Sequence, residues 1–310
     1  MPVTIPCQDI TEAVEFLIQQ LGFRLDMIAP ADSPRLAQVS GHGLSFRLEN
    51  VTEREPTEAR PPNSEFIISR RDDNDWRAGR AGMEYRDLIP GRIGGQLIAS
   101  HIRLTKGGEV PDYVHYHKIR FQMIYCISGR IRAVYQDQGP PFWLEPGDCI
   151  VQPPEIRHRV LEAETNSEVV EISNPAVHET WVDHDIVLPN PEDNPDHLFS
   201  GQRFLRHTAE GAQFIPTTDR GCEVRDTGAS TATGGLVDVR EVQCAEGWSY
   251  SAGSADLQFY FVLDGTVEVE SSAHGVTRLG RNDALTVVNR QTHLFKADQD
   301  ARVLEVSAKI

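Results

Sequence analysis

The stretch VHYHKIRFQMIYCISG, Val114–Gly129, places two histidines in front of an apolar run that ends at a glycine. In a β-strand, side chains two residues apart project from the same face. His115 and His117 are therefore predicted to point together, and they converge if that face is the inside of a barrel. Gln122 follows five residues after His117.

A third histidine, His158, comes at the end of GDCIVQPPEIRH, which reads as a tight turn, a buried strand and a second turn. A neighbouring antiparallel strand could bring it beside His115 and His117. Three neutral imidazoles with open positions suit a borderline divalent metal such as Fe(II), Mn, Ni, Cu or Zn. The sequence therefore predicts a metal site, and the alternative is a barrel that has lost its metal.

The chain also contains an internal repeat of β-prone segments. FQMIYCISGRIRAVY aligns with LQFYFVLDGTVEVES, so that Gly129 matches Gly265. LEPGDCIVQPPEIRH aligns with LGRNDALTVVNRQTH, so that His158 matches His293. Two matched strand pairs that share a turn glycine predict two copies of one barrel.

The second copy lacks most of the candidate ligands. In the register of the repeat, the positions of His115, His117 and Gln122 are taken by Ser251, Gly253 and Gln258. Only His293 is left, and one imidazole with a serine does not hold a transition metal. The second barrel is therefore predicted to be structural, closing sheet edges or forming a dimer face.

Short β-prone runs between Gly, Pro and Asp turns predict a mainly β protein. The first segment is different: it predicts a βαβββ unit whose helix spans 11–21, with Asp9 or Thr11 as the cap and Gly22 as the stop. The predicted divisions are a βαβββ module at 1–52, a linker at 53–85, a first barrel at 86–185, a connection at 186–230 and a second barrel at 231–310.

Composition limits the choice of partners. The 310 residues carry a formal net charge of −16, which disfavours nucleic acid and anionic lipid. No apolar run approaches the ~18 residues of a membrane span, and no secretory signal pattern is visible. Five scattered cysteines without a CxxC pair argue against a disulfide framework. We expect a cytoplasmic protein with a small-molecule substrate.

The segments GGEVPDYVHYHKIRFQMIYCISG and LEPGDCIVQPPEIRH resemble the two motifs of the cupin superfamily. In this resemblance His115 and His117 take the paired-histidine positions, Gln122 takes the glutamate position, and His158 takes the histidine of the second motif. The glycine and proline positions are filled by Gly129, Gly147 and Pro153, while Ile156 stands near the inner glycine and Glu162 at the asparagine. The resemblance implies two jelly-roll barrels, a bicupin.

Gln122 is the departure with a chemical consequence. A neutral glutamine carbonyl coordinates a metal weakly or only binds a metal-bound water. Without the carboxylate, a three-histidine site is more positive by one charge and favours anionic ligands. The resemblance to dioxygenase-type cupins implies an Fe(II)-dependent oxidoreductase acting on a small anionic or enolisable molecule. A non-redox cupin isomerase, lyase or hydrolase, and a non-catalytic ligand-binding protein, are the alternatives.

Gln122 is predicted to be both a metal ligand and a catalytic residue, together with Arg120 and Tyr125. If side chains alternated regularly from His117 onward, Gln122 would point away from the metal. A bulge between the two residues is therefore needed, and cupin strands usually have one here. Arginines suit the binding of anions. Further groups expected around the metal are Tyr113, Tyr116, Gln152 and Arg157, although alternation with this bulge favours the other face for Tyr116 and Tyr125.

The first 50 residues resemble a single βαβββ module of the glyoxalase/vicinal-oxygen-chelate family, in DITEAVEFLIQQLGFRLDMIAP and GHGLSFRLE. That family builds its metal site from two paired modules. Here there is one, and its first strand, VTIPC, has no histidine; Glu49 alone would bind nothing. We therefore expect this unit to serve packing or dimerisation, which would give a homodimer.

Overall fold

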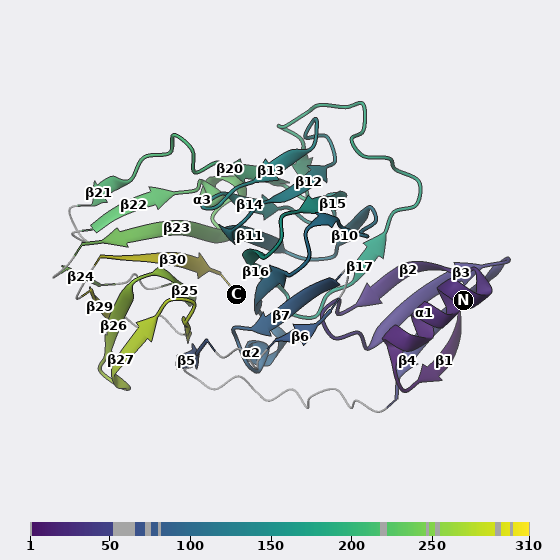
Figure 1. Cartoon of the computed structure of the whole chain (residues 1–310), viewed down its shortest axis with the longest axis horizontal. Helices are drawn as coiled ribbons and strands as arrows, with labels where there is room; N and C mark the ends of the chain where they lie inside the picture. Colours follow the sequence, from purple (N-terminus) through teal and green to yellow (C-terminus); the bar gives the residue numbers. More distant parts are fainter. Residues whose placement is uncertain are drawn as a thin grey trace.

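The computed structural model describes residues 2–51, 66–71, 76–79, 82–217, 222–245, 248–251, 255–288, 293–297 and 300–309. The described part is mainly β, as predicted, and contains two jelly-roll barrels. Figure 1 shows the N-terminal unit at one end of the long axis, the first barrel in the middle and the second barrel at the other end.

The N-terminal unit has the predicted βαβββ order. Asp9 caps the helix by accepting a 3.0 Å hydrogen bond from the Glu12 amide, and Gly22 ends it at φ 67°. β1 pairs with β4 in parallel and the other pairs are antiparallel, in the order β1-β4-β3-β2. The bounds are β1 Val3–Cys7, α1 Ile10–Leu21, β2 Arg24–Ala29, β3 Leu36–Gly41 and β4 Leu44–Asn50.

Two sheets form the first barrel. One has the order β20-β14-β11-β16-β8-β7-β6, and the other continues from the N-terminal unit as β2-β17-β10-β15-β12-β13, with β9 also paired to β15. The pairing of β2 with β17 therefore makes the N-terminal sheet part of the barrel wall. The bounds are β6 Arg77–Ala78, β7 Met83–Asp87, α2 Arg92–Gly95, β8 Ile98–Leu104, β9 Gly108–Glu109, β10 His115–His117, β11 Phe121–Ser128, β12 Ile131–Tyr135, β13 Phe142–Leu144, β14 Cys149–Gln152, β15 His158–Ala163, β16 Ser167–Asn174, β17 Thr180–Val182 and β20 Leu205–His207.

The second barrel has the same plan. Its larger sheet has the order β21-β22-β23-β30-β25-β28-β5, and its smaller sheet has the order β24-β29-β26-β27. A separate hairpin of β18 and β19 lies in the connection between the barrels. The bounds are β5 Phe66–Ser69, β18 Leu198–Phe199, β19 Gln202–Arg203, β21 Ile215–Thr217, β22 Cys222–Asp226, α3 Ala229–Ala232, β23 Val237–Cys244, β24 Trp248–Ser251, β25 Leu257–Asp264, β26 Thr266–Ser271, β27 Gly275–Gly280, β28 Ala284–Val288, β29 Leu294–Ala297 and β30 Ala301–Ala308.

The predicted internal repeat is visible in detail. The order β14-β11-β16-β8 of the first barrel corresponds to β28-β25-β30-β23 of the second. A bulge interrupts β11 between Cys126 and Ser128, and a bulge interrupts β25 at the matching place. Gly129 and Gly265 follow these bulges with φ of 64° and 75°, and in both a Cβ would collide with the adjoining strand. The aligned glycines thus share one structural requirement.

The predicted boundaries differ from the observed ones because each barrel borrows an edge strand. Residues 53–65 of the expected linker lie outside the described residues, but β5 and β6 fall within 53–85 and β7 begins there. β5 pairs with β28 of the second barrel, whereas β20, from the expected connection, pairs with β14 of the first. A short edge strand carries little periodic pattern, so these segments read as linker in the sequence.

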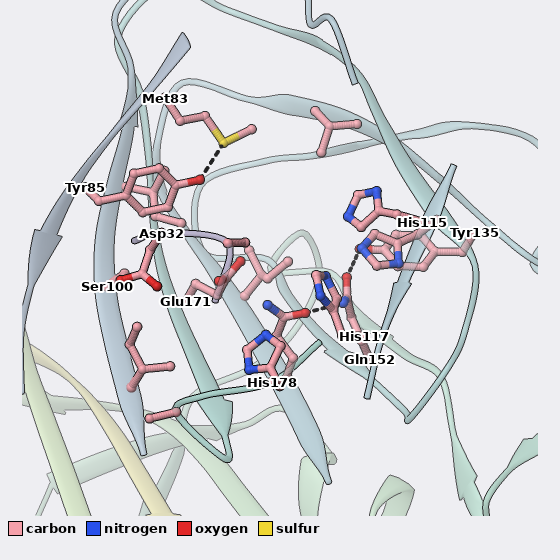
Figure 2. Close-up of a pocket in the computed structure, with 18 residues that line it drawn as sticks. Asp32, Met83, Tyr85, Ser100, His115, His117, Tyr135, Gln152, Glu171 and His178 are labelled. Carbon is pink, nitrogen blue, oxygen red and sulfur yellow. Dashed lines mark hydrogen bonds between the residues drawn. The ribbon is translucent and has the colours of Figure 1, made fainter. Parts of the chain in front are cut away.

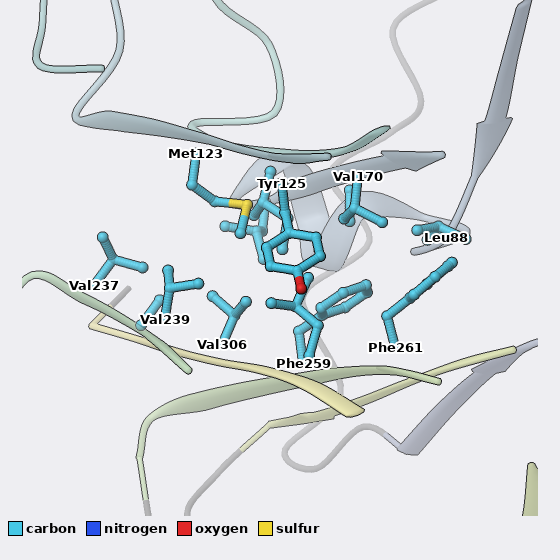
Figure 3. Close-up of a cluster of buried hydrophobic side chains, with 14 of the residues drawn as sticks. Leu88, Met123, Tyr125, Val170, Val237, Val239, Phe259, Phe261 and Val306 are labelled. Atoms are coloured by element: carbon cyan, nitrogen blue, oxygen red, sulfur yellow. The ribbon is translucent and has the colours of Figure 1, made fainter. Parts of the chain in front are cut away.

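The two barrels pack face to face through one apolar layer. Figure 3 shows Met123 and Tyr125 of the first barrel above Val239, Phe259 and Val306 of the second. All of these side chains are at most 2% exposed. Burial of each large apolar side chain contributes roughly 1.5–3 kcal/mol, so the second barrel stabilises the sheet that carries β11.

Candidate metal centre and its cavity

Three histidines meet inside the first barrel. Ligand atoms of His115, His117 and His158 all lie within 4.8 Å of one another, and each residue is buried. The ring centroids of His115 and His158 are 4.2 Å apart, and His117 lies 5.0 Å and 5.1 Å from these two. The predicted triad therefore forms.

Strand pairing explains this convergence. His115 and His117 are the two ends of β10, and His115 stands opposite His158 at the start of β15 in antiparallel register. The turn before β15 carries Glu155 in the left-handed region, at φ 62°. The residue that adopts the glycine-like conformation is thus Glu155 rather than Ile156.

The Nδ1 atom of each ring is bound to a protein oxygen. His115 Nδ1 lies 2.8 Å from the Tyr113 carbonyl, His117 Nδ1 lies 2.9 Å from Thr180 Oγ1, and His158 Nδ1 lies 3.0 Å from the Ile156 carbonyl. Such bonds fix the ring orientation and leave Nε2 as the atom that can face a metal. The donor set fits a divalent metal, and His115, His117 and His158 are the residues that would hold it.

A carboxylate stands behind one of the three rings. Asp112 Oδ1 is 3.6 Å from His115 Nδ1, and Asp112 Oδ2 accepts a 3.0 Å bond from the Val160 amide. A carboxylate in this place raises the basicity of a metal-bound imidazole. Asp112 was not predicted, because it lies in an irregular segment where no strand alternation indicates its direction.

Gln122 faces the cavity, as the resemblance requires. β10 ends at His117 and β11 begins at Phe121, and this break shifts the alternation so that Gln122 and Ile124 point inward. Its Oε1 accepts a 2.5 Å hydrogen bond from Gln152 Nε2, and the Tyr135 hydroxyl donates to Gln152 Oε1 at 2.6 Å. The Gln122 oxygen is thus bound to an amide, and its NH₂ is the group that can donate into the cavity.

Tyr135 anchors that chain of hydrogen bonds. Burial, followed by the negative charges of Glu171 and Asp112, raises the pKa of the Tyr135 phenol. The hydroxyl therefore stays protonated and keeps donating to Gln152.

The triad opens on a cavity of about 100 Å³. Figure 2 shows His115 and His117 at one end, Tyr85, Ser100 and Asp32 at the other, and Glu171 between them. Apolar walls come from β7, β8, β11 and β15. The lining residues are Ala31, Asp32, Met83, Tyr85, Ile98, Ser100, Ile102, His115, His117, Gln122, Ile124, Tyr135, Gln152, His158, Val160, Glu171, Ala176 and His178.

The N-terminal unit supplies part of this wall. Ala31 and Asp32, in the turn after β2, line the cavity, and Asp32 is held by an ion pair with Arg92 of α2. The unit was predicted to serve only packing or dimerisation; its packing on the barrel also brings it to the site. Glu171 was likewise missed, although the strand EVVEIS places this carboxyl at an inward position.

Two predicted catalytic residues lie elsewhere. Tyr125 points into the layer between the barrels, where its hydroxyl donates a 2.7 Å bond to Glu241 and burial raises its pKa. Arg120 is exposed, with its guanidinium 3.4 Å from Asn174 Oδ1. Both predictions are corrected: the break before β11 that turns Gln122 inward turns Tyr125 outward.

Of the other groups expected around the metal, some line the cavity and some do not. Arg157 pairs with Asp183 at 2.9 Å and lies over the Tyr116 ring, so neither side chain lines the cavity. Gln152 does line it, and Tyr113 contributes its backbone carbonyl.

The matching place in the second barrel has no such centre within the described residues. Gly253 lies outside them, and the side chain of Ser251 is not described. His293 is 2% exposed and packs edge-on against Phe66, with ring centroids 5.5 Å apart. Burial lowers its pKa. A structural role for the second barrel stays a prediction.

Comparison with known proteins agrees with the geometry. Residues 100–173, in the first barrel, match the family described as the cupin domain. Curated protein sequences give no match. No helix in the described part of the chain has the length and apolar character to cross a membrane.

Solved structures of oxalate decarboxylase from Bacillus subtilis have the same two-barrel fold. Two mutants of that enzyme align with TM-scores of 0.59 and 0.58 at 13% and 14% sequence identity. A structure from a study of its Mn(II) centres aligns at 0.57 and 13%. Each covers 78% of this chain and 77% of the other. At such identities the likeness establishes the fold alone.

Proposed function

We propose that this protein is a mononuclear metal-dependent cupin enzyme of the Fe(II) dioxygenase type, acting on a small enolisable molecule. The observation that supports it is the meeting of three oriented imidazoles at one end of a cavity with polar and apolar walls. A bound divalent metal would supply Lewis acidity or, as iron, a site for dioxygen chemistry. Fe(II) is the proposed ion, and Mn, Ni, Cu and Zn fit the same donors.

The residues around the triad have separate tasks in this proposal. Thr180, the Tyr113 carbonyl and the Ile156 carbonyl orient the three rings. Gln122 donates from its NH₂ to a molecule in the cavity. The apolar walls lower the local dielectric constant, which strengthens polar contacts inside.

A second candidate is a cupin isomerase, lyase or hydrolase, favoured by the likeness to a decarboxylase. The glyoxalase-like relation of the N-terminal unit, a homodimer and a cytoplasmic location also remain proposals.

Elemental analysis of protein expressed in metal-replete medium, followed by oxygen uptake with diketones and dihydroxybenzoates, tests the function. We expect one metal per chain and oxygen consumption that is lost in His158→Ala. Turnover that persists without oxygen would favour the second candidate. A wild-type chain without stoichiometric metal would overturn both.

A further inference from the structure

The charges around the cavity are unlike those of a site for dianions. Among the described residues that line it, none is lysine or arginine, whereas Asp32 and Glu171 both carry carboxyl groups. Arg92 neutralises Asp32 from outside the lining.

The carboxylates also change the net charge expected around a bound metal. Three neutral imidazoles leave a divalent ion with both its charges, which by itself would favour an anionic substrate. Glu171 in the cavity and Asp112 behind His115 together offset those two charges. A ligand with two negative charges would therefore enter a site whose net charge is already close to zero. It would also be repelled by Glu171, because charges in the cavity are poorly screened.

The two arginines that could have bound such an anion are engaged elsewhere. Arg120 is exposed beside Asn174, and Arg157 is paired with Asp183. The groups at the far end from the histidines are instead a carboxylate, the Ser100 hydroxyl and the Tyr85 phenol. These groups bind hydrogen-bond donors, and a phenol ring also attracts a cation.

We propose that the cavity takes a small uncharged or monocationic substrate that binds the metal at the histidine end and places an ammonium or hydroxyl group against Glu171. This inference rests on the proposed function and narrows its substrate class. It selects an enolisable molecule with a hydrogen-bond-donating tail and excludes a dicarboxylate.

Three hydroxamates that share one metal-chelating group and differ in the charge of the other end test the preference at Glu171. Glycine hydroxamate carries an ammonium group, acetohydroxamate a methyl group and malonic monohydroxamate a carboxylate. Calorimetric titration of the metal-loaded protein is expected to rank them in that order, with at least about tenfold between the ammonium and carboxylate tails because a charge at Glu171 is poorly screened. Equal or tighter binding of the carboxylate tail would overturn the inference.

The ratio of the affinity for glycine hydroxamate to the affinity for malonic monohydroxamate is expected to fall about tenfold in Glu171→Gln. This substitution removes the negative charge of the side chain and keeps its shape. Glu168→Gln, on the same strand, is the matched control: Glu168 bonds His101 outside the cavity lining, so its loss should leave the ratio unchanged. An unchanged ratio in Glu171→Gln would also overturn the inference.

The two proposals fail in different ways. Metal-loaded protein that binds the hydroxamates without ranking them contradicts the substrate class alone. Protein that takes up no metal and binds none of them contradicts the proposed function, and the substrate class with it. The wild-type ranking decides the question even where a variant does not fold.

Discussion

The two barrels are built on one strand plan, yet only the first gathers imidazoles among the described residues. In the first, Gln122 stands opposite Gln152 across β11 and β14, and this polar pair leads to Tyr135. In the second, Gln258 stands opposite Val287. Phe66 of the borrowed strand β5 then packs against His293. The comparison shows that a jelly roll does not by itself require a polar interior.

The same contrast separates what supports the fold from what supports the chemistry. Shared features, such as the bulges and the glycines at 129 and 265, belong to the barrel. Gln122 and Gln258 also occupy matching positions in both copies. The three histidines, Thr180 and Glu171 belong to the first barrel, and the metal site rests on them.

Removing one imidazole should give the largest effect. His117→Ala is expected to lower metal affinity more than about 100-fold, because loss of a partner outside the coordination sphere alone costs 10- to 100-fold. His293→Ala, the matching histidine of the second barrel, should leave the metal content at its wild-type value. Elemental analysis and competition with a chelator measure both. Full metal content in His117→Ala would show that the triad is not the site.

Restoring a carboxylate at the glutamine position should act oppositely in the two barrels. Gln122→Glu is expected to raise metal affinity about tenfold, because a negative charge is added beside three imidazoles and the bond from Gln152 is kept. Gln258→Glu should bind no metal, and it should lower the free energy of unfolding by a few kcal/mol, because Gln258 is 1% exposed. Chelator competition and denaturant unfolding measure these changes; equal metal binding by both variants would remove the distinction between the barrels.

The smallest expected effect concerns acid stability. The pKa of His293 is lowered in the folded protein, so below about pH 6.5 the unfolded chain takes up a proton that the folded chain resists, and stability falls as pH falls. His293→Leu should remove this loss and gain about 1 kcal/mol over wild type between pH 8 and pH 5.5. Part of the acid sensitivity should persist, because burial also lowers the pKa of His101 and His178. Parallel stability curves from denaturant unfolding at several pH values would contradict the prediction.

The sequence by itself determined the features that depend on short-range pattern. Alternation along β10 placed His115 and His117 on one face, and the aligned repeats predicted two barrels of which one lacks ligands. The capped helix and βαβββ order of the first 50 residues were also readable, because caps and periodicity are local.

Only the tertiary structure decided which distant segments share a wall. Phe66 pairs with Val287 across more than two hundred residues, and the turn with Asp32 reaches a cavity formed mainly by strands after residue 82. A three-residue break between β10 and β11 determined that Gln122 enters the cavity and that Tyr125 leaves it. Such outcomes follow from long-range pairing and from the irregular register at one break, and neither leaves a periodic signal in the chain.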